Sequence, residues 1–303
     1  MFLGRKDNLM KICFIGFGEA AGAIIGGWGA ARAGSIRVFD IKTLDPATSK
    51  GIAIRAAALG VKACQTAAEA LAGADLVFSA VTADQAVAAV EAYSGAMPKG
   101  AVWCDLNSCA PKSKQTAEAV VAAAGGRYLD VAVMAPVYPA RNMVPCLVSG
   151  PCGDDVTPLL AALPMNVRQV GDEVGRASSI KMVRSIMVKG LEALTAECTL
   201  AAVAAGVEEE VFPSLKSGHP YIDMEARSAY NFERTLVHGQ RRAAEMDEVA
   251  KMLRDLNLPD GMSSATAAWQ RYLSDTDITL PDADITNYQW FAAKYLLRTK
   301  AAE

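Results

Sequence analysis

The stretch Lys11–Asp40, KICFIGFGEAAGAIIGGWGAARAGSIRVFD, decides the fold of this chain. It begins with the apolar run Ile12–Ile15, which has the length and content of a buried strand. A glycine turn, Gly16–Ala21, follows, and then a small, apolar segment over residues 22–33 predicts a helix. A second strand is expected at residues 36–39. The order strand, turn, helix, strand is that of a βαβ unit.

The turn has the spacing of a dinucleotide-binding fingerprint. Gly16 permits the tight turn, Gly18 lets backbone N–H groups approach a pyrophosphate, and Ala21 is small enough for close helix–strand packing. The helix that follows offers the partial positive charge of its N-terminus to phosphates. A glycine-rich packing turn would share the pattern, but the flanking strands favour the binding site. We expect cofactor contacts from Gly16, Phe17, Gly18, Glu19, Ala20 and Ala21.

Asp40 ends the second strand, 22 residues after Gly18. An acid at this position accepts hydrogen bonds from the adenosine ribose hydroxyls. Because its negative charge would oppose the 2′-phosphate of NADP, NAD is the expected cofactor. Lys42 follows two residues later and could offset that charge, which leaves NADP open.

Composition limits the other possibilities. The 303 residues suffice for two domains, and a net charge of −3 argues against nucleic acid as the main partner. Apolar residues make up 52% of the chain, yet no run of about twenty lacks polar residues, so no membrane span is expected. Residues 1–9 are polar and charged, and we expect them to form a tail.

Cysteine and histidine usage points away from metal binding. The seven cysteines are scattered and odd in number, no CxxC motif occurs, and the histidines are His219 and His238. A zinc site is therefore not expected, and the cytoplasm is the expected compartment.

The alternation of strands and helices continues after Asp40. Buried strands are expected at residues 74–81, 100–105, 128–133 and 146–149, and helices at residues 48–59 and 111–124. This pattern predicts a parallel, doubly wound Rossmann sheet over residues 10–172. Ligands of such sheets bind beyond the carboxyl ends of the strands. The strand-end residues expected to converge on one crevice are Asp40, Val81, Thr82 and Asn107.

Beyond residue 172 the pattern becomes helical, and we expect an all-α domain over residues 173–303. The segment Arg176–Ala205 contains no proline and predicts one long interdomain helix, closed by Gly206. Its apolar residues recur at helical spacing, at Ile180, Val183, Met187, Leu191 and Leu194. Short breaks are expected at Phe212-Pro213, Leu258-Pro259 and Leu280-Pro281.

Lys181 stands one turn into this long helix, where the two predicted domains join. Arg184 and Ser185 follow at i+3 and i+4, so the three side chains are neighbours on the helix surface. A lysine that points into an interdomain cleft can act as a general acid or base. A solvated surface lysine is the simpler interpretation of these residues alone.

Three separate motifs occur in a definite order: the turn Gly16-Phe17-Gly18, the strand-end segment Asp105–Pro111 (DLNSCAP), and Gly175 followed by Lys181. Their order and spacing resemble the β-hydroxyacid dehydrogenases, a superfamily that includes 3-hydroxyisobutyrate and 6-phosphogluconate dehydrogenases. The segment His238–Met246 (HGQRRAAEM) resembles the branch of phosphogluconate-dehydrogenase-like proteins whose C-terminal domain is uncharacterised.

The resemblance implies roles for the matching positions. Lys181 matches the lysine that takes the hydroxyl proton as hydride leaves the substrate carbon. The family segment D-x-S-T-x-x-P matches Asp105–Pro111 and helps to hold nicotinamide and substrate, with Asn107 at the serine and Ser108 at the threonine. The resemblance also implies dimers built through the helical domain.

Three departures from the family pattern affect substrate binding. Met134-Ala135-Pro136 replaces the Ser-Gly-Gly that cradles a substrate carboxylate, Ser185 replaces an asparagine, and Arg184 stands where a smaller polar residue is common. We therefore expect a substrate other than 3-hydroxyisobutyrate. One helical face carries Arg234, His238, Arg241 and Arg242, and it could bind an anionic group or be solvated and paired with Glu233 and Glu245. Candidate substrate contacts are Ser108, Cys109, Met134, Arg184 and His238.

The sequence thus predicts an NAD-dependent dehydrogenase, with NADP possible, that acts on the CH–OH group of a β-hydroxy acid or related alcohol. Lys181 is the expected general acid/base, and Ser185 and Ser108 orient the substrate. The expected partners are an anionic small molecule and another copy of the chain. An imine reductase on the same fold and a non-catalytic dinucleotide sensor are the alternatives. Lys181 argues against both, because imine reductases that resemble this family generally lack it.

Overall fold

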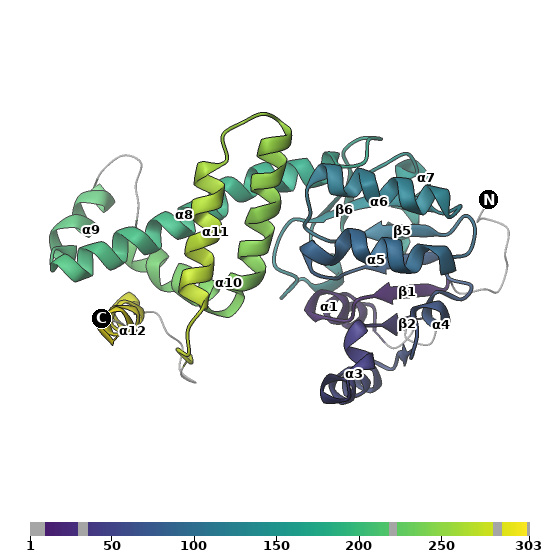
Figure 1. Cartoon of the computed structure of the whole chain (residues 1–303), viewed down its shortest axis with the longest axis horizontal. Coiled ribbons are helices and arrows are strands. Elements are labelled where there is room, and N and C mark those ends of the chain that lie inside the picture. Colours follow the sequence, from purple (N-terminus) through teal and green to yellow (C-terminus); the bar gives the residue numbers. More distant parts are fainter. Residues whose placement is uncertain (1–9, 30–35, 218–222, 281–286, 302–303) are drawn as a thin grey trace. The chain divides into compact units, whose positions relative to one another are not determined.

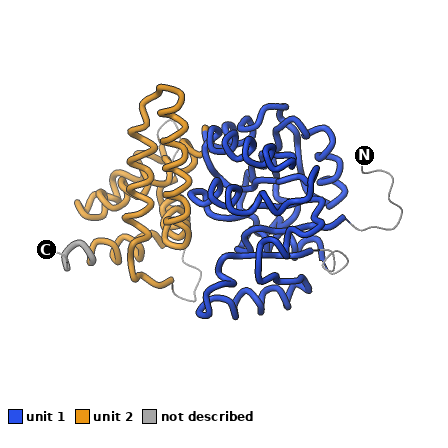
Figure 2. Tube along the Cα trace, turned by 45° about the vertical axis from the view of Figure 1, so that its right-hand side comes forward, with its two compact units in different colours: residues 1–182 blue, residues 183–303 orange. Residues whose placement is uncertain are grey.

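The computed structural model describes residues 10–29, 36–217, 223–280 and 287–301. The predicted tail at residues 1–9 lies outside this part of the chain. Contacts divide the chain into two compact units, residues 1–182 and residues 183–303 (Figure 2). The division falls inside a long helix.

The described part of the first unit contains an eight-stranded sheet in the order β3-β2-β1-β4-β5-β6-β7-β8 (Figure 1). The order reverses between β1 and β4, which is where doubly wound sheets bind ligands. The strands are β1 (Ile12–Ile15), β2 (Ile36–Phe39), β3 (Lys62–Ala63), β4 (Leu76–Ser79), β5 (Val102–Asp105), β6 (Arg127–Val133), β7 (Cys146–Ser149) and β8 (Val167–Gln169).

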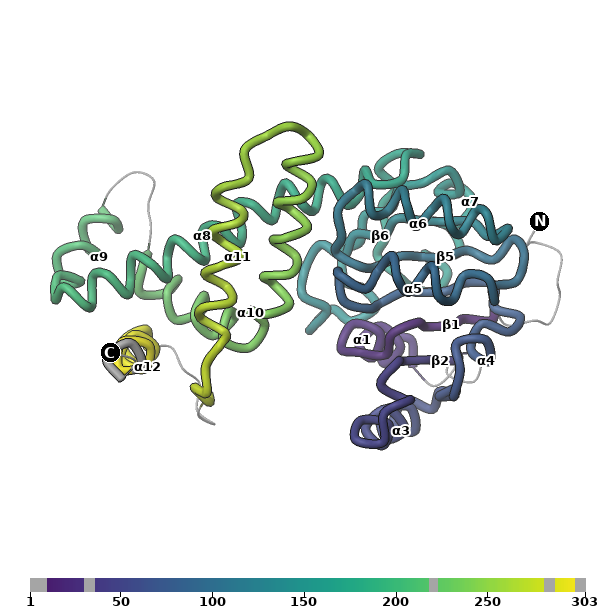
Figure 3. Tube along the Cα trace, in the orientation of Figure 1, coloured from purple at the N-terminus to yellow at the C-terminus, as the bar shows by residue number. Residues whose placement is uncertain are grey.

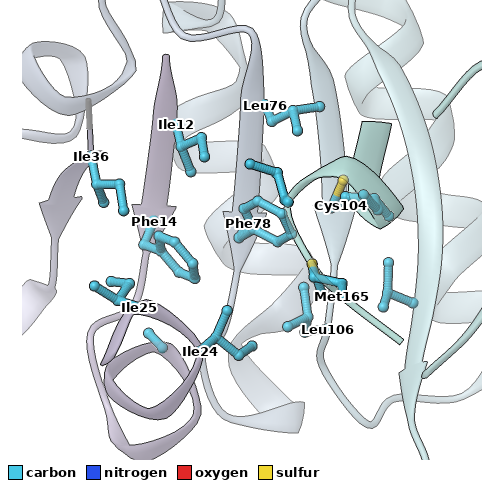
Figure 4. Packing of buried hydrophobic residues seen from close by; sticks show 14 of the residues in the cluster. Ile12, Phe14, Ile24, Ile25, Ile36, Leu76, Phe78, Cys104, Leu106 and Met165 are labelled. Carbon is cyan, nitrogen blue, oxygen red and sulfur yellow. The ribbon is translucent and has the colours of Figure 1, made fainter. Parts of the chain in front are cut away.

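Helices cover both faces of the sheet, because successive strand residues point to opposite faces. Phe14 packs on the face covered by α1, α3 and α7, where its ring stacks on Phe78 at 5.0 Å between centroids (Figure 4). Ile15 packs on the other face, under α4, α5 and α6. The helices are α1 (Glu19–Trp28), α3 (Pro46–Leu59), α4 (Ala67–Leu71), α5 (Ala86–Tyr93), α6 (Pro111–Ala123) and α7 (Gly153–Ala162).

The parallel sheet predicted from the sequence is confirmed for β1 to β6, but the last two strands run in the opposite direction. β7 pairs antiparallel to β6, and β8 pairs parallel to β7. A parallel pair needs a long crossover, usually with a helix. Residues 134–145 join β6 to β7 with the short 3-10 helix η4 (Arg141–Met143), so the chain simply turns back.

The bounds predicted for the first helix need correction. α1 begins at Glu19 instead of residue 22, with Gly18 at its N-cap. It ends at Trp28, because Gly29 takes a φ of +71° and leaves the helical conformation. The glycine turn therefore leads directly into the helix, and its amide groups belong to the first helical turn.

The described helices beyond the sheet are α8 (Arg176–Ala205), α9 (Glu208–Ser217), α10 (Met224–Asp255), α11 (Gly261–Ser274) and α12 (Tyr288–Ala301), as Figure 3 shows. The long helix and the break at Leu258-Pro259 are confirmed. The break at Phe212-Pro213 is wrong, because Pro213 lies inside α9 and the chain turns earlier, at Gly206 with a φ of +68°. Pro281 lies outside the described residues.

The second unit has its own core. Phe232 of α10 lies 5.6 Å from both Phe291 and Tyr295 of α12, measured between ring centroids. The Tyr295 hydroxyl donates to the Leu273 carbonyl of α11 at 2.6 Å. Within the described ranges, no helix has the length and apolar content needed to cross a membrane.

Candidate functional site

The two glycines of the turn, Gly16 and Gly18, have different surroundings. Gly16 has a φ of +87°, and a Cβ there would lie 2.4 Å from the Ala80 carbonyl oxygen, so no other residue fits. A Cβ at Gly18 would meet no protein atom within 4 Å, and the Gly18 N-cap offers no side-chain acceptor to the first turn of α1. Intramolecular packing therefore explains Gly16, whereas the space at Gly18 leaves the N-terminus of α1 open to an anionic group.

Two charged side chains hold the turn through the backbone of Phe17. The Phe17 N–H donates to Asp40 Oδ2 at 2.7 Å, and Asp40 Oδ1 accepts from the Lys42 N–H at 2.9 Å. Arg55 of α3 donates to the Phe17 carbonyl and lies 5.6 Å from the centroid of its ring. The Phe17 ring itself is buried in the core. The sequence identified Asp40 but missed Arg55, whose position depends on how α3 packs.

Of the strand-end residues, Val81 and Asn107 are in contact, and the Asn107 side chain makes structural hydrogen bonds. Its Oδ1 accepts from the Val81 N–H at 2.7 Å, and its Nδ2 donates to the Ser79 hydroxyl at 3.0 Å. Asn107 is buried and ties the end of β5 to the end of β4. Thr82 follows as an exposed residue at the N-cap of the 3-10 helix η2 (Ala83–Gln85).

A fully buried ion cluster lies beneath this edge. The Lys114 ammonium is 3.0 Å from Asp105 Oδ1 and 3.4 Å from Asp130 Oδ1, and the side chains of all three are 0% exposed. The Tyr128 hydroxyl donates to Asp105 Oδ2 at 2.5 Å, and the Asn107 N–H donates to Asp105 Oδ1 at 2.8 Å. Burial lowers the pKa of Lys114, but Asp105 and Asp130 outweigh it, so the net shift is upward.

Asp130 extends this cluster to the first turn of α8. Its Oδ2 accepts from the Gly175 and Ser178 N–H groups at 3.2 and 3.0 Å, and its Oδ1 accepts from the Ser178 hydroxyl at 2.7 Å. A carboxylate at a helix N-terminus satisfies amides that have no partner within the helix. Sequence reasoning missed this cluster, although Lys114 occupies a core position in the stripe Ala110, Lys114, Ala117 and Val121.

Lys181 and Ser108, which the sequence analysis assigned to one site, are in contact. The Lys181 ammonium donates a hydrogen bond to the Ser108 hydroxyl, 73 positions away in the chain. Both side chains are half-buried. Ser108 follows Asn107, which Asp105 anchors, and Lys181 follows Ser178, which Asp130 anchors. The buried cluster thus holds the segment that carries Ser108 through Asp105 and the segment that carries Lys181 through Asp130.

The neighbouring candidates differ in accessibility. Cys109 is buried, and a thiolate at this position would raise the pKa of Lys114. The Cys146 thiol at the start of β7 is also buried, which raises its pKa to about 12, with Lys181 opposing the shift. Met134 is half-buried and packs with Ala132, Leu147 and Ala177. None of the seven cysteines forms a disulfide.

In the second unit, Ser185 lies beside a second lysine. The buried Lys189 ammonium donates to the Ser185 hydroxyl at 3.3 Å and pairs with Glu245 Oε2 of α10 at 2.7 Å. Burial lowers the pKa of Lys189, and Glu245 opposes that shift. Arg184 is exposed. Sequence reasoning did not single out Lys189, which lies on the buried stripe of α8.

Two of the four residues of the basic face predicted on α10 pair with glutamates of the same unit. Arg242 is buried and pairs with Glu192 of α8, and Arg241 is 2.9 Å from Glu245 Oε1. Arg234 and His238 are half-buried. Across the described residues, no three His, Cys, Asp or Glu side chains are arranged to hold a metal ion.

Chemically, the first unit combines a phosphate-compatible helix N-terminus with an amine at a serine hydroxyl. The turn from Gly16 to Ala21 and Asp40 have the form that a nicotinamide dinucleotide needs. Lys181 supplies a group that can give or take a proton.

Comparison with protein families agrees with this geometry. The family described as "NAD binding domain of 6-phosphogluconate dehydrogenase" matches residues 11–171. A second family, a domain of unknown function, matches residues 202–273. Together the two matches cover the Rossmann sheet and most of the helical unit.

Solved structures resemble the whole chain. A conserved hypothetical protein from Sinorhizobium meliloti 1021 is 37% identical, with a TM-score of 0.73 over 95% of this chain and 96% of that one. A conserved protein of unknown function, described as structurally similar to 3-hydroxyacid dehydrogenases, is 27% identical, with a TM-score of 0.65 over 88% and 97%. Mycobacterium tuberculosis 3-hydroxyisobutyrate dehydrogenase shares the fold at 16% identity, with a TM-score of 0.70 over 96% and 99%.

Proposed function

The chain belongs to the family of the NAD-binding domain of 6-phosphogluconate dehydrogenase, and from this premise we propose that it is a nicotinamide-dependent dehydrogenase of a β-hydroxy acid or a related alcohol. The observation that carries the proposal is the hydrogen bond from the Lys181 ammonium to the Ser108 hydroxyl. This hydrogen bond holds an amine near the carboxyl end of β5, and ligands of such sheets bind at the carboxyl ends of the strands.

Lys181 acts as the general acid/base in this proposal. In the oxidative direction its free amine takes the proton from the substrate hydroxyl, and in the reverse direction its ammonium returns that proton to the carbonyl oxygen. Ser108 keeps the amine in position and orients the substrate oxygen. A nicotinamide dinucleotide, which the glycine turn and Asp40 would hold, would supply the hydride chemistry at the carbinol carbon.

A dehydrogenase screen tests the proposal. The purified protein is incubated with NAD or NADP and a panel of β-hydroxy acids and simple alcohols, and reduced nicotinamide is followed by its absorbance. A parallel assay with NADH or NADPH and a panel of imines follows the loss of that absorbance. We expect turnover with at least one anionic hydroxy acid. Tight NAD binding without turnover of any alcohol or imine would instead indicate a dinucleotide sensor, and turnover of imines alone would indicate an imine reductase.

We propose NAD as the preferred cofactor, because the Asp40 carboxylate lies beside the glycine turn and repels a 2′-phosphate. Titration of protein fluorescence should give tighter binding for NAD than for NADP. Asp40→Ala removes a repulsion worth about 1–3 kcal/mol and should narrow the ratio of the two dissociation constants. It should also weaken both cofactors, since the Phe17 N–H loses its acceptor. Equal or tighter NADP binding by the natural chain would contradict this preference.

We also propose a homodimer or a larger homo-oligomer, assembled through α8. Val183, Met187 and Leu194 are 57%, 63% and 58% exposed along one side of this helix, and Leu191 lies between them. An apolar stripe of this length on a folded chain favours a protein interface. Light scattering at micromolar concentration should therefore give at least twice the 31.9 kDa of one chain.

The matched variants are Met187→Glu with Leu194→Glu, which should dissociate the assembly, and Glu197→Gln, an exposed position on the same helix, which should not. A mass of one chain for the natural protein would refute the oligomer.

A further inference from the structure

Two buried ion pairs join α8 to the α10 segment His238–Met246. Lys189 pairs with Glu245, and Glu192 pairs with Arg242. On each helix a positive side chain is followed three positions later by a negative one, and the first charge of each helix pairs with the second charge of the other. A buried charge without a partner is strongly unfavourable, so only this register satisfies all four groups.

The same segment brings a third helix close. A Cβ at Gly239 would lie 2.6 Å from the Gln270 carbonyl oxygen and 2.5 Å from the Ser274 Cβ, so glycine permits the approach of α11. The Gln270 amide then donates to Glu192 Oε2 at 3.3 Å. The segment therefore holds α8 in one rotation against α10 and α11.

Lys189 has a further contact that the ion pairs do not require. Its ammonium donates to the Ser185 hydroxyl at 3.3 Å. An ammonium has donors and no acceptor, so the Ser185 oxygen must accept and its own O–H points elsewhere. Ser185 follows Lys181 at i+4, and residues at that spacing are neighbours on a helix surface.

We propose that Lys189 is a positioning residue that acts through Ser185, holding the Ser185 hydroxyl as a hydrogen-bond donor toward a substrate oxygen beside Lys181. The proposal deepens the proposed dehydrogenase function and rests on it. It also assigns a task to the segment His238–Met246, whose Glu245 keeps the Lys189 ammonium at Ser185. The ligand group it implies is an acceptor oxygen, such as that of a carboxylate or a carbonyl.

A double-mutant cycle tests this coupling. The variants are Lys189→Met, Ser185→Ala and the two together, assayed for kcat and KM with the hydroxy acid that the natural enzyme oxidises. We expect Lys189→Met and Ser185→Ala each to lower kcat/KM about tenfold or more, and the double variant to be no worse than Ser185→Ala alone. Lys189→Arg, which keeps a charged donor, should retain most activity. NAD affinity should be the same in all variants.

Glu197→Gln is the matched control. It removes an exposed charge on the same helix and leaves both buried ion pairs intact, so it should leave kcat and KM unchanged. If Lys189→Met does not fold, Glu245→Gln replaces it in the cycle with Ser185→Ala, under the same criterion.

Multiplicative losses in the cycle would overturn the coupling between Lys189 and Ser185, as would a loss of activity in Glu197→Gln equal to that in Lys189→Met. Absence of any dehydrogenase turnover by the natural enzyme would overturn the proposed function itself. That result is seen before any variant is compared, so the two failures are distinguishable.

Discussion

Lys181→Ala should abolish turnover and leave NAD affinity nearly unchanged. The Lys181 ammonium contacts Ser108, whereas the groups suited to the dinucleotide are the glycine turn and Asp40. A general acid/base contributes about 10²–10⁴-fold to the rate, and a group that also positions the substrate hydroxyl contributes more. Lys181→Met keeps the length of the side chain without the proton and should be equally inactive. A pH–rate series and an NAD titration on each variant measure the two effects.

Lys112→Ala is the control for this experiment, because it removes an exposed lysine near the strand-end segment. It should keep the activity of the natural enzyme. If Lys181→Ala retained more than about a tenth of that activity, the proton transfer would have to be carried by another group.

Lys114→Met should remove a large part of the stability of the first unit. It leaves the buried carboxylates of Asp105 and Asp130 without their cation, and breaking a buried ion pair in this way costs about 3–5 kcal/mol. Whole domains are stable by only about 5–15 kcal/mol. Denaturant unfolding followed by circular dichroism should therefore show a large fall in the midpoint concentration.

The pH dependence of this contribution follows from the sign of the shift. The pKa of Lys114 is raised in the folded chain, so its stabilisation is complete below the unfolded pKa of about 10.4 and is lost as pH rises through the folded value. The difference in unfolding free energy between the natural chain and Lys114→Met should thus stay constant near neutral pH and shrink only in strong alkali.

The exposed neighbour Lys112→Met is the control and should change the free energy of unfolding by no more than about 0.5 kcal/mol. A loss below about 1 kcal/mol in Lys114→Met would contradict the role assigned to the cluster.

Local patterns in the sequence were enough for the elements and the nucleotide fold. Runs such as Ile12–Ile15 and the proline-free Arg176–Ala205 carry the period of their own secondary structure, so β1 and α8 have the expected bounds. Gly16, Gly18 and Asp40 could be singled out because the dinucleotide-binding fingerprint is defined by the spacing of such residues. Lys181 and Ser108 were assigned by resemblance, and the hydrogen bond between them was not visible in either segment.

Tertiary structure decided what depends on partners distant in sequence. The reversal of β7 follows from a connection that lacks a crossover helix, and α1 ends early because of one glycine conformation. In the sequence alone, Lys114 and Lys189 are ordinary charged residues on helices. Their carboxylate partners Asp130 and Glu245 lie on other elements, so only the folded structure shows the ion pairs. A buried charge is strongly destabilising unless a partner of opposite charge lies beside it. The sequence by itself thus determined which segments form the site, and the packing of those segments decided which charges build it and which hold it in place.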